Sequence, residues 1–387
     1  MPAASRASSP CSGEQRFSPA ESVTHGSRHD ADVLILGAGP AGLSVGFELQ
    51  QRGVSFLILE KGCVGDSWKR MPTHLKLVSP WKANCLRGPN SGCFARHFQA
   101  SREQFVNYLQ HYAAKANLPI RTEVTVESVQ KLDDDTFRVQ TSGGDFLSRF
   151  VVNATGYFSN PYVPQIPGTR ESRIPQLHVA QYRDPRHLES LLLDSNRLVL
   201  IVGKRLSAGQ TMLELVQAGF DIALSHRSPI QYGSGPFAWW FLFRLFPWLE
   251  WLKLRWKGDH APSNDVRMPG GPARKMIKSG RVKTFPSIAA FEPDAVIFAN
   301  GQRLRPALVI YATGFRPALA HLAPPGLAIS EQSSRPRLLH LESVEVPGLY
   351  FIGLDHARNF RSRFLRGIRE DAPLLANRLR QDIARPA

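Results

Sequence analysis

The chain has 387 residues, of which 43% are hydrophobic and 21% charged, a composition typical of a folded protein that excludes global disorder. This length exceeds one ordinary core and predicts two to three compact units. The net charge of +16 favours anionic partners such as nucleotide phosphates or acidic lipids, and no zinc-finger spacing or RNP-type sequence supports a nucleic acid partner.

Residues 1–30 are rich in Ser, Ala, Pro, Gly and Arg and lack an apolar core, which predicts a flexible leader without a signal-peptide apolar region. The four cysteines are few and include no C-x-x-C pair, so the sequence argues against a dithiol–disulfide mechanism. They also give no sign of a secreted disulfide scaffold, and we expect a cytoplasmic location.

The first periodic segment is a strand, a glycine turn, a helix and a second strand. The apolar run 31–36 leads directly into Gly37-Ala-Gly-Pro-Ala-Gly42 and a helix, and the apolar run 54–59 ends at Glu60. In this fingerprint the glycines permit a tight turn, close approach of backbone to a pyrophosphate, and close packing of helix on strand. The helix N-terminus attracts phosphate, and the acid binds ribose hydroxyls. The predicted contacts are Gly37, Gly39, Pro40, Ala41, Gly42, Glu60 and Lys61.

A similar plan recurs later in the chain. After a helix at 101–116 and a strand at 146–153 ending in Ala154-Thr-Gly156, the Pro-rich stretch 160–168 predicts a linker. A strand at 197–202, the loop 203–209, a helix and a strand ending near Arg227 then repeat the nucleotide-binding order.

Residues 237–256 combine many aromatic side chains with basic ones. Pro247 and the charges interrupt the segment too often for a membrane-spanning helix. An interfacial helix that gives peripheral membrane contact, a lid over an apolar channel, and a helix buried in the protein all remain open.

The C-terminal part continues with a strand at 307–312 into Thr313-Gly314 and a short strand at 348–353. A helix over 363–380 is expected to close the molecule, with Leu374, Leu375 and Leu379 facing inward.

Taken with Gly65-Asp-Ser-Trp68 and Leu365-Arg-Gly367, these motifs resemble those of the flavin-containing monooxygenases and related bacterial flavoproteins over about residues 31–379. The resemblance implies an α/β fold with two Rossmann-like dinucleotide-binding domains, an FAD domain interrupted by an NADPH domain. The expected division is a leader at 1–30, the first FAD part at 31–160, the NAD(P)H domain at 161–295 and the second FAD part at 296–387.

The resemblance also implies roles for single residues. Trp68 lies against the flavin or, equally, in the core. The two Ala-Thr-Gly turns are hinges first and ligand contacts second, and Asp371 is either a flavin-facing or a solvated acid. His178 is given a linker role and no catalytic one. The residues carried over as cofactor contacts are Trp68, Thr155, Gly156, Thr313, Gly314, Gly353, Asp355 and Gly367.

The second glycine loop departs from the family pattern. Gly203 and Ser207 match it, but Arg205 takes the position of the middle glycine, where a side chain should obstruct a pyrophosphate unless the guanidinium itself contacts phosphate. Arg227 is placed where it could bind a 2′-phosphate, which favours NADPH over NADH.

The implied activity is oxygenation of a nitrogen, sulfur or carbonyl centre of a small molecule by O₂ through a C4a-hydroperoxyflavin, with FAD and NADPH as cofactors and no metal. An asparagine that relatives place near the flavin is missing, and Ser79 stands in that stretch as a weak catalytic candidate. The alternatives are a flavin oxidase or dehydrogenase that does not use NADPH, and a non-catalytic, membrane-docked regulatory flavoprotein.

Overall fold

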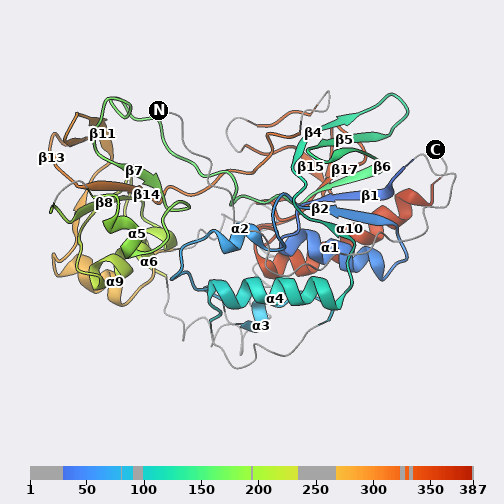
Figure 1. The fold of residues 1–387 in the computed structure, drawn as a ribbon, viewed down its shortest axis with the longest axis horizontal. Helices are drawn as coiled ribbons and strands as arrows, with labels where there is room; N and C mark the ends of the chain where they lie inside the picture. Colours follow the sequence, from blue (N-terminus) through green and yellow to red (C-terminus); the bar gives the residue numbers. More distant parts are fainter. Residues whose placement is uncertain are drawn as a thin grey trace.

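The computed structural model describes residues 29–79, 81–89, 99–192, 195–233, 267–322, 327–330 and 334–385. Nearly all of the predicted leader and the whole aromatic segment 237–256 lie outside these ranges, so their predictions stay predictions. Within the described ranges the chain forms two α/β lobes, seen on the right and on the left of Figure 1.

The first lobe is built on a nine-stranded sheet. Its centre is β1 (Ala31–Leu36), which pairs in parallel with β2 (Phe56–Leu59) on one side and β6 (Gly144–Asn153) on the other. Four residues of β1 are fully buried, because the sheet is covered on both faces. The other strands are β3 (Ile120–Arg121), β4 (Val126–Lys131), β5 (Phe137–Thr141), β15 (Leu338–Leu339), β16 (Glu342–Ser343) and β17 (Leu349–Phe351).

Helices lie beside this sheet (Figure 1): one of them, α1 (Pro40–Gln50), contacts β1 and β2, and α4 and α10 pack against α1. In α4, a capping box between Ser101 and Gln104 satisfies two backbone N–H groups and fixes the first turn. In the C-terminal α10, Leu375 and Leu379 are buried as predicted, but Leu374 is 49% exposed, so its predicted inward position is wrong. The helices are α1 (Pro40–Gln50), α2 (Asp66–Lys69), α3 (Trp81–Asn84), α4 (Arg102–Lys115) and α10 (Leu365–Ile383).

The second lobe has a five-stranded sheet, all of whose neighbouring strands are parallel, and a small three-stranded sheet. In order across the larger sheet, its strands are β10 (Lys283–Phe285), β9 (Asp221–Ser225), β8 (Leu198–Val202), β14 (Leu308–Tyr311) and β7 (Gln176–His178). The small sheet contains β11 (Ile288–Phe291), β12 (Val296–Phe298) and β13 (Arg303–Leu304). The helices are α5 (Pro185–Glu189), α6 (Leu206–Gln217) and α9 (Pro272–Lys278).

The mixed first sheet, with its parallel centre, and the parallel second sheet confirm the predicted α/β fold class. The predicted start of the second FAD part at 296 does not match them, because β12, β13 and β14 all lie in the second lobe and β14 pairs with both β7 and β8. β14 ends at Tyr311, and the Ala312-Thr-Gly314 turn that follows it leads out of the second lobe. The next strand of the first sheet is β15.

Two chain segments connect the lobes and run alongside each other. Tyr162 donates its N–H to the carbonyl of Gly314 at 3.0 Å, and Arg316 donates to Asn160 at 2.9 Å. An antiparallel bridge joins Pro161 to Phe315 between them. The lobes are therefore joined by a hydrogen-bonded pair of strand-like segments, which holds the cleft edges of both sheets near each other.

Candidate active site

A cavity of about 2090 Å³ lies where the loops of the two lobes meet. Its walls come from the carboxyl ends of parallel strands in both sheets: the loops after β1, β6 and β17 on one side, and those after β8, β9 and β14 on the other. This is the edge of an α/β sheet at which ligands bind. Of the predicted contacts, Gly39, Pro40, Ala41, Trp68, Thr155, Gly156, Gly203, Ser207, Arg227, Thr313, Gly314, Gly353 and Asp355 line it.

The first glycine loop has the shape that a pyrophosphate site needs. A Cβ on Gly42 would lie 1.9 Å from the carbonyl oxygen of Gly37, and one on Gly37, at φ +106°, would lie 2.9 Å from that of Ala154. These two glycines therefore serve close packing and do not line the cavity. Gly39 lines it, and a Cβ there would meet nothing within 4 Å. Because no side chain caps α1, its first N–H groups remain for an anion.

Glu60, at the end of β2, braces this loop. Its carboxylate accepts the N–H of Ala38 at 2.7 Å and that of Gly62 at 3.0 Å. Burial raises the pKa of Glu60 above its usual value, and the two N–H bonds act in the opposite direction. Neither Glu60 nor Lys61 lines the cavity, so the predicted ribose contact remains a proposal while the bracing role is visible.

The two Ala-Thr-Gly turns fasten the crossings between the lobes. Thr155 donates its hydroxyl to the carbonyl of Ala318 at 2.8 Å, and the Thr313 hydroxyl donates to the carbonyl of Tyr162. Gly156 and Gly314 adopt φ angles of +63° and +89°, a region that favours glycine. The turns therefore hold the two crossings in place and line the cavity, while their roles as hinges and ligand contacts stay predictions.

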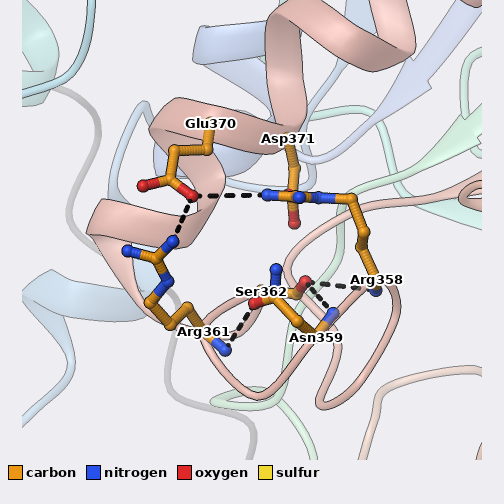
Figure 2. Close-up of polar contacts among 6 residues, drawn as sticks. All are labelled: Arg358, Asn359, Arg361, Ser362, Glu370 and Asp371. Carbon is orange, nitrogen blue, oxygen red and sulfur yellow. Dashed lines mark hydrogen bonds and ion pairs between the residues drawn. The ribbon is translucent and has the colours of Figure 1, made fainter. Parts of the chain in front are cut away.

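The segment that leads into α10 carries a network of charged side chains (Figure 2). Asp371 is fully buried and lies 2.6 Å from the guanidinium of Arg358, while Glu370 contacts both Arg358 and Arg361, at 3.3 and 2.8 Å. Ser362 accepts the backbone N–H of Arg358 at 3.2 Å. The alternative that Asp371 is a solvated acid is wrong, because its carboxylate holds the loop onto the first turns of α10.

Two other predicted cofactor contacts, Gly367 and Asp355, lie in or close to the same segment. A Cβ on Gly367 would lie 1.9 Å from the carbonyl oxygen of Arg361, so this glycine lets the loop approach the helix and does not line the cavity. Asp355 lines the cavity and pairs with Arg363 at 3.1 Å, while its N–H donates to the hydroxyl of Tyr157 at 2.7 Å.

The second glycine loop tolerates Arg205 because the backbone does not require glycine there. Arg205 has φ −109° and caps α6 through its backbone, with its side chain exposed at the cavity. Gly203 does require glycine: its φ is +152°, and a Cβ would lie 2.4 Å from the carbonyl oxygen of Ala312. A Cβ on Gly209 would similarly meet Pro269 at 2.6 Å, which shows how closely α6 packs on the neighbouring loop.

Basic side chains dominate this end of the cavity. Lys204 donates to the hydroxyl of Ser228 at 2.5 Å and so ties the glycine loop to the loop after β9, which carries Arg227. Arg205 and Arg267 line the same wall. The donor set fits an anionic ligand with more than one phosphate.

His178 is the last residue of β7, in the second sheet. Its Nδ1 accepts the N–H of Ala180 at 3.1 Å, so Nε2 carries the proton and donates to the carbonyl of Gly314 at 3.0 Å. Burial lowers the pKa of His178 to about 4, which keeps the ring neutral. This neutral ring ties the end of β7 to the second crossing between the lobes.

Trp68 packs edge-on against Phe105 and Phe158 and also lines the cavity, so its contact with a flavin stays a prediction. Ser79 lines the cavity too, and its carbonyl accepts the side-chain amide of Asn84 at 2.9 Å. The sequence analysis missed Asn84, which is 4% exposed and also reaches the cavity. Its place five residues beyond Ser79 gave no motif by which to find it.

The described residues contain no cluster of three or more His, Cys, Asp or Glu side chains that is arranged to hold a metal ion. Within the same part of the chain, no helix combines the length and apolar character needed to cross a membrane.

Comparison with known proteins identifies the family. Residues 34–236, more than half of the chain, match the family model described as pyridine nucleotide-disulphide oxidoreductase. The chain belongs to this family. Its membership and the relatives below confirm the predicted resemblance to flavin-containing monooxygenases and the prediction of a flavin-dependent oxidoreductase. The expectation of FAD as cofactor is confirmed at the level of the family.

Relatives of this oxidoreductase match along most of their length. An uncharacterized CzcO-like oxidoreductase of Geobacillus kaustophilus is 28% identical, covering 90% of this chain and 98% of its own. Indole-3-pyruvate monooxygenase YUCCA4 of Oryza sativa is 27% identical, covering 91% and 87%. A solved structure, the flavin-containing monooxygenase from Stenotrophomonas maltophilia, superposes with a TM-score of 0.73 at 24% identity, covering 92% and 99%, and shows a shared fold.

Proposed function

We propose that this protein is an FAD-dependent monooxygenase that uses NADPH and oxygenates a nitrogen, sulfur or carbonyl centre of a small molecule. One observation carries the proposal: the glycine loops of both lobes open onto the same cavity. Ligands held on the two loops therefore share one space, which is what electron transfer from a nicotinamide to a flavin requires.

The residues fit the two cofactors in different ways. On the first side, the backbone of Gly39 to Ala41 and the N-terminus of α1 would hold the FAD pyrophosphate, with Trp68, Gly353 and Asp355 further along the cavity. Glu60 would reach the ribose from its position beneath the loop. On the second side the predicted contacts Gly203, Ser207 and Arg227 are joined by Lys204 and Arg205.

The chemistry that bound FAD supplies is acceptance of a hydride from the nicotinamide and reductive activation of O₂. The chain's own part is binding, orientation and exclusion of water. Aromatic side chains supply the apolar wall that limits water at the reacting centre. The aromatic residues that line the cavity are Trp68, Tyr157, Phe158, Tyr162, Phe315, Phe360 and Phe364.

The relatives support an oxygenase. YUCCA4 is named an indole-3-pyruvate monooxygenase, and the structural relative is named a flavin-containing monooxygenase. The absence of a C-x-x-C pair leaves the chain without the adjacent dithiol that a disulfide mechanism of the thioredoxin-reductase type uses.

The test begins with anaerobic stopped-flow absorbance of the yellow protein mixed with NADPH and, separately, with NADH. We expect NADPH to bleach the flavin band faster, followed by incorporation of one ¹⁸O atom from ¹⁸O₂ into a thioether. If neither nucleotide bleaches the band but an organic substrate does so under argon, the protein is an oxidase or dehydrogenase in which Arg205 blocks the nucleotide.

A further inference from the structure

Three polar side chains from different parts of the chain meet in the wall of the cavity. His74 Nδ1 lies 2.6 Å from Glu214 Oε2, and the hydroxyl of Tyr182 donates to the same oxygen at 2.5 Å. His74 comes from the first lobe and Glu214 from α6 of the second, and both line the cavity. No sequence motif pointed to either of them.

The backbone around His74 is held firmly in place. The N–H of Leu77 donates to Ala100 at 2.9 Å and that of Thr73 to Arg183 at 3.1 Å, while Arg102 reaches the carbonyl of Met71 at 2.7 Å. The loop 71–77 is therefore fixed on both lobes. This rigidity sets the direction of the imidazole, as an acid–base group requires.

Tyr182 orients the carboxylate of Glu214. It is fully buried, and burial followed by its hydrogen bond with Glu214 raises its pKa well above the usual value. It stays protonated and acts as a donor, so Glu214 accepts from Tyr182 on one side and faces His74 on the other. The contact of 2.6 Å does not have hydrogen-bond geometry, but a carboxylate this close to Nδ1 favours the proton on that nitrogen electrostatically and leaves the Nε2 lone pair available.

The exposed part of His74 faces the cavity. Its side chain is 17% exposed and its Nδ1 is buried against Glu214, so the accessible nitrogen is Nε2. Other charged groups near this loop are Lys76, which lines the cavity, and the guanidinium of Arg102.

We propose that His74, oriented by Glu214 and Tyr182, is the base that removes a proton from an ammonium substrate bound in this cavity. In the step, the N–H bond of the ammonium breaks, the proton forms a bond to Nε2, and the electron pair stays on the substrate nitrogen. The neutral amine then carries the lone pair that oxygenation of nitrogen consumes. This inference rests on the proposed function and narrows its substrate class to amines that are protonated at neutral pH.

The experiment compares two substrates of the holoenzyme: a tertiary alkylamine, which must lose a proton before it reacts, and an alkyl aryl thioether, which has none to lose. In His74→Gln, we expect the ratio of kcat/KM for the amine to kcat/KM for the thioether to fall about 100-fold, the range of a lost general base. If both substrates slow equally, or neither does, the inference is overturned. If the wild-type protein oxygenates neither substrate, the proposed function itself fails.

The variant Glu214→Gln tests whether Glu214 orients His74 or only packs against it. The amide group can donate to Nδ1, which moves the ring proton to Nε2 and removes the base while keeping the size of the side chain. We expect the same fall in the amine-to-thioether ratio. Gln210→Ala is the matched control, since it removes a contact of α6 with Lys76, at 3.4 Å, and leaves the His74–Glu214 pair intact. A similar fall in the control would assign the effect to loosening between the lobes.

A second measurement does not depend on turnover. Diethylpyrocarbonate modifies accessible imidazole nitrogens, and peptide mass spectrometry locates each modified histidine. We expect His74 to react, and the bound alkylamine to protect it in proportion to its occupancy. A protein in which His74 resists the reagent while exposed histidines react has no accessible Nε2 in the cavity, and the inference is then wrong.

Discussion

The neutral state of His178 predicts a specific loss of stability in acid. Its pKa is lowered to about 4 by burial, whereas an unfolded histidine titrates near 6.5. Between these values the unfolded chain binds a proton that the native protein does not, so the free energy of unfolding falls as the pH falls. The full difference is about 3 kcal/mol at about 1.4 kcal/mol per pH unit, of which about 2 kcal/mol is lost by pH 5.

Urea unfolding of wild type and His178→Gln, followed by tryptophan fluorescence from pH 7.5 to 4.5, measures this loss. Glutamine keeps an amide donor near the carbonyl of Gly314 but does not titrate, so its deficit relative to wild type should shrink by about 2 kcal/mol between pH 7.5 and 5. His321, whose pKa burial also lowers to about 4, is present in both proteins and cancels. A deficit that is the same at both pH values would refute the assigned protonation state.

Three further substitutions test the site. Gly42→Ala should leave little folded protein, because the new Cβ would lie 1.9 Å from a carbonyl oxygen. Gly39→Ala, whose Cβ meets nothing within 4 Å, should fold normally but lose bound FAD, seen as loss of the 450 nm absorbance on gel filtration. Asp371→Asn should lower the free energy of unfolding by about 2 kcal/mol in urea titrations, since it weakens the charged hydrogen bond of a fully buried carboxylate to Arg358, and Glu370→Gln, at a 37% exposed site, by less than about 1 kcal/mol. Lys204→Met should raise the apparent Kd for NADPH about tenfold in stopped-flow reduction and change that for NADH much less; equal changes would exclude a role in recognising the 2′-phosphate, the group by which the two nucleotides differ.

Local patterns predicted the parts of the site that lie along a single stretch of chain. The loop 37–42 could be found because turn, phosphate approach and helix packing each demand glycine at a fixed spacing. The same logic pointed to Gly203, whose backbone requires glycine, and to the departure at Arg205, whose extended backbone conformation only the structure could show.

Features that depend on distant segments could not be found in this way. His74 and Glu214 meet only because the loop 71–77 lies against α6, and neither residue belongs to a recognisable spacing. Asp371 reads as a surface acid in a helix rich in charge, yet a neighbouring loop buries it against Arg358. The return to the first sheet was placed too early because β14 has the same apolar pattern whichever sheet receives it.

The pairing of β17 with β6 has a consequence for synthesis of the protein. β6 is complete once residue 153 has been synthesised, and β5 covers residues 144–148 of the edge that faces away from β1. The strand that covers residues 151–153 of that edge lies at 349–351, beyond the whole second lobe. Until then, part of the growing chain presents an unpaired, apolar strand edge, which is the kind of surface that invites wrong pairing between nascent chains. We expect the second lobe to fold while this edge is still open, and the last segment to close the first sheet after release.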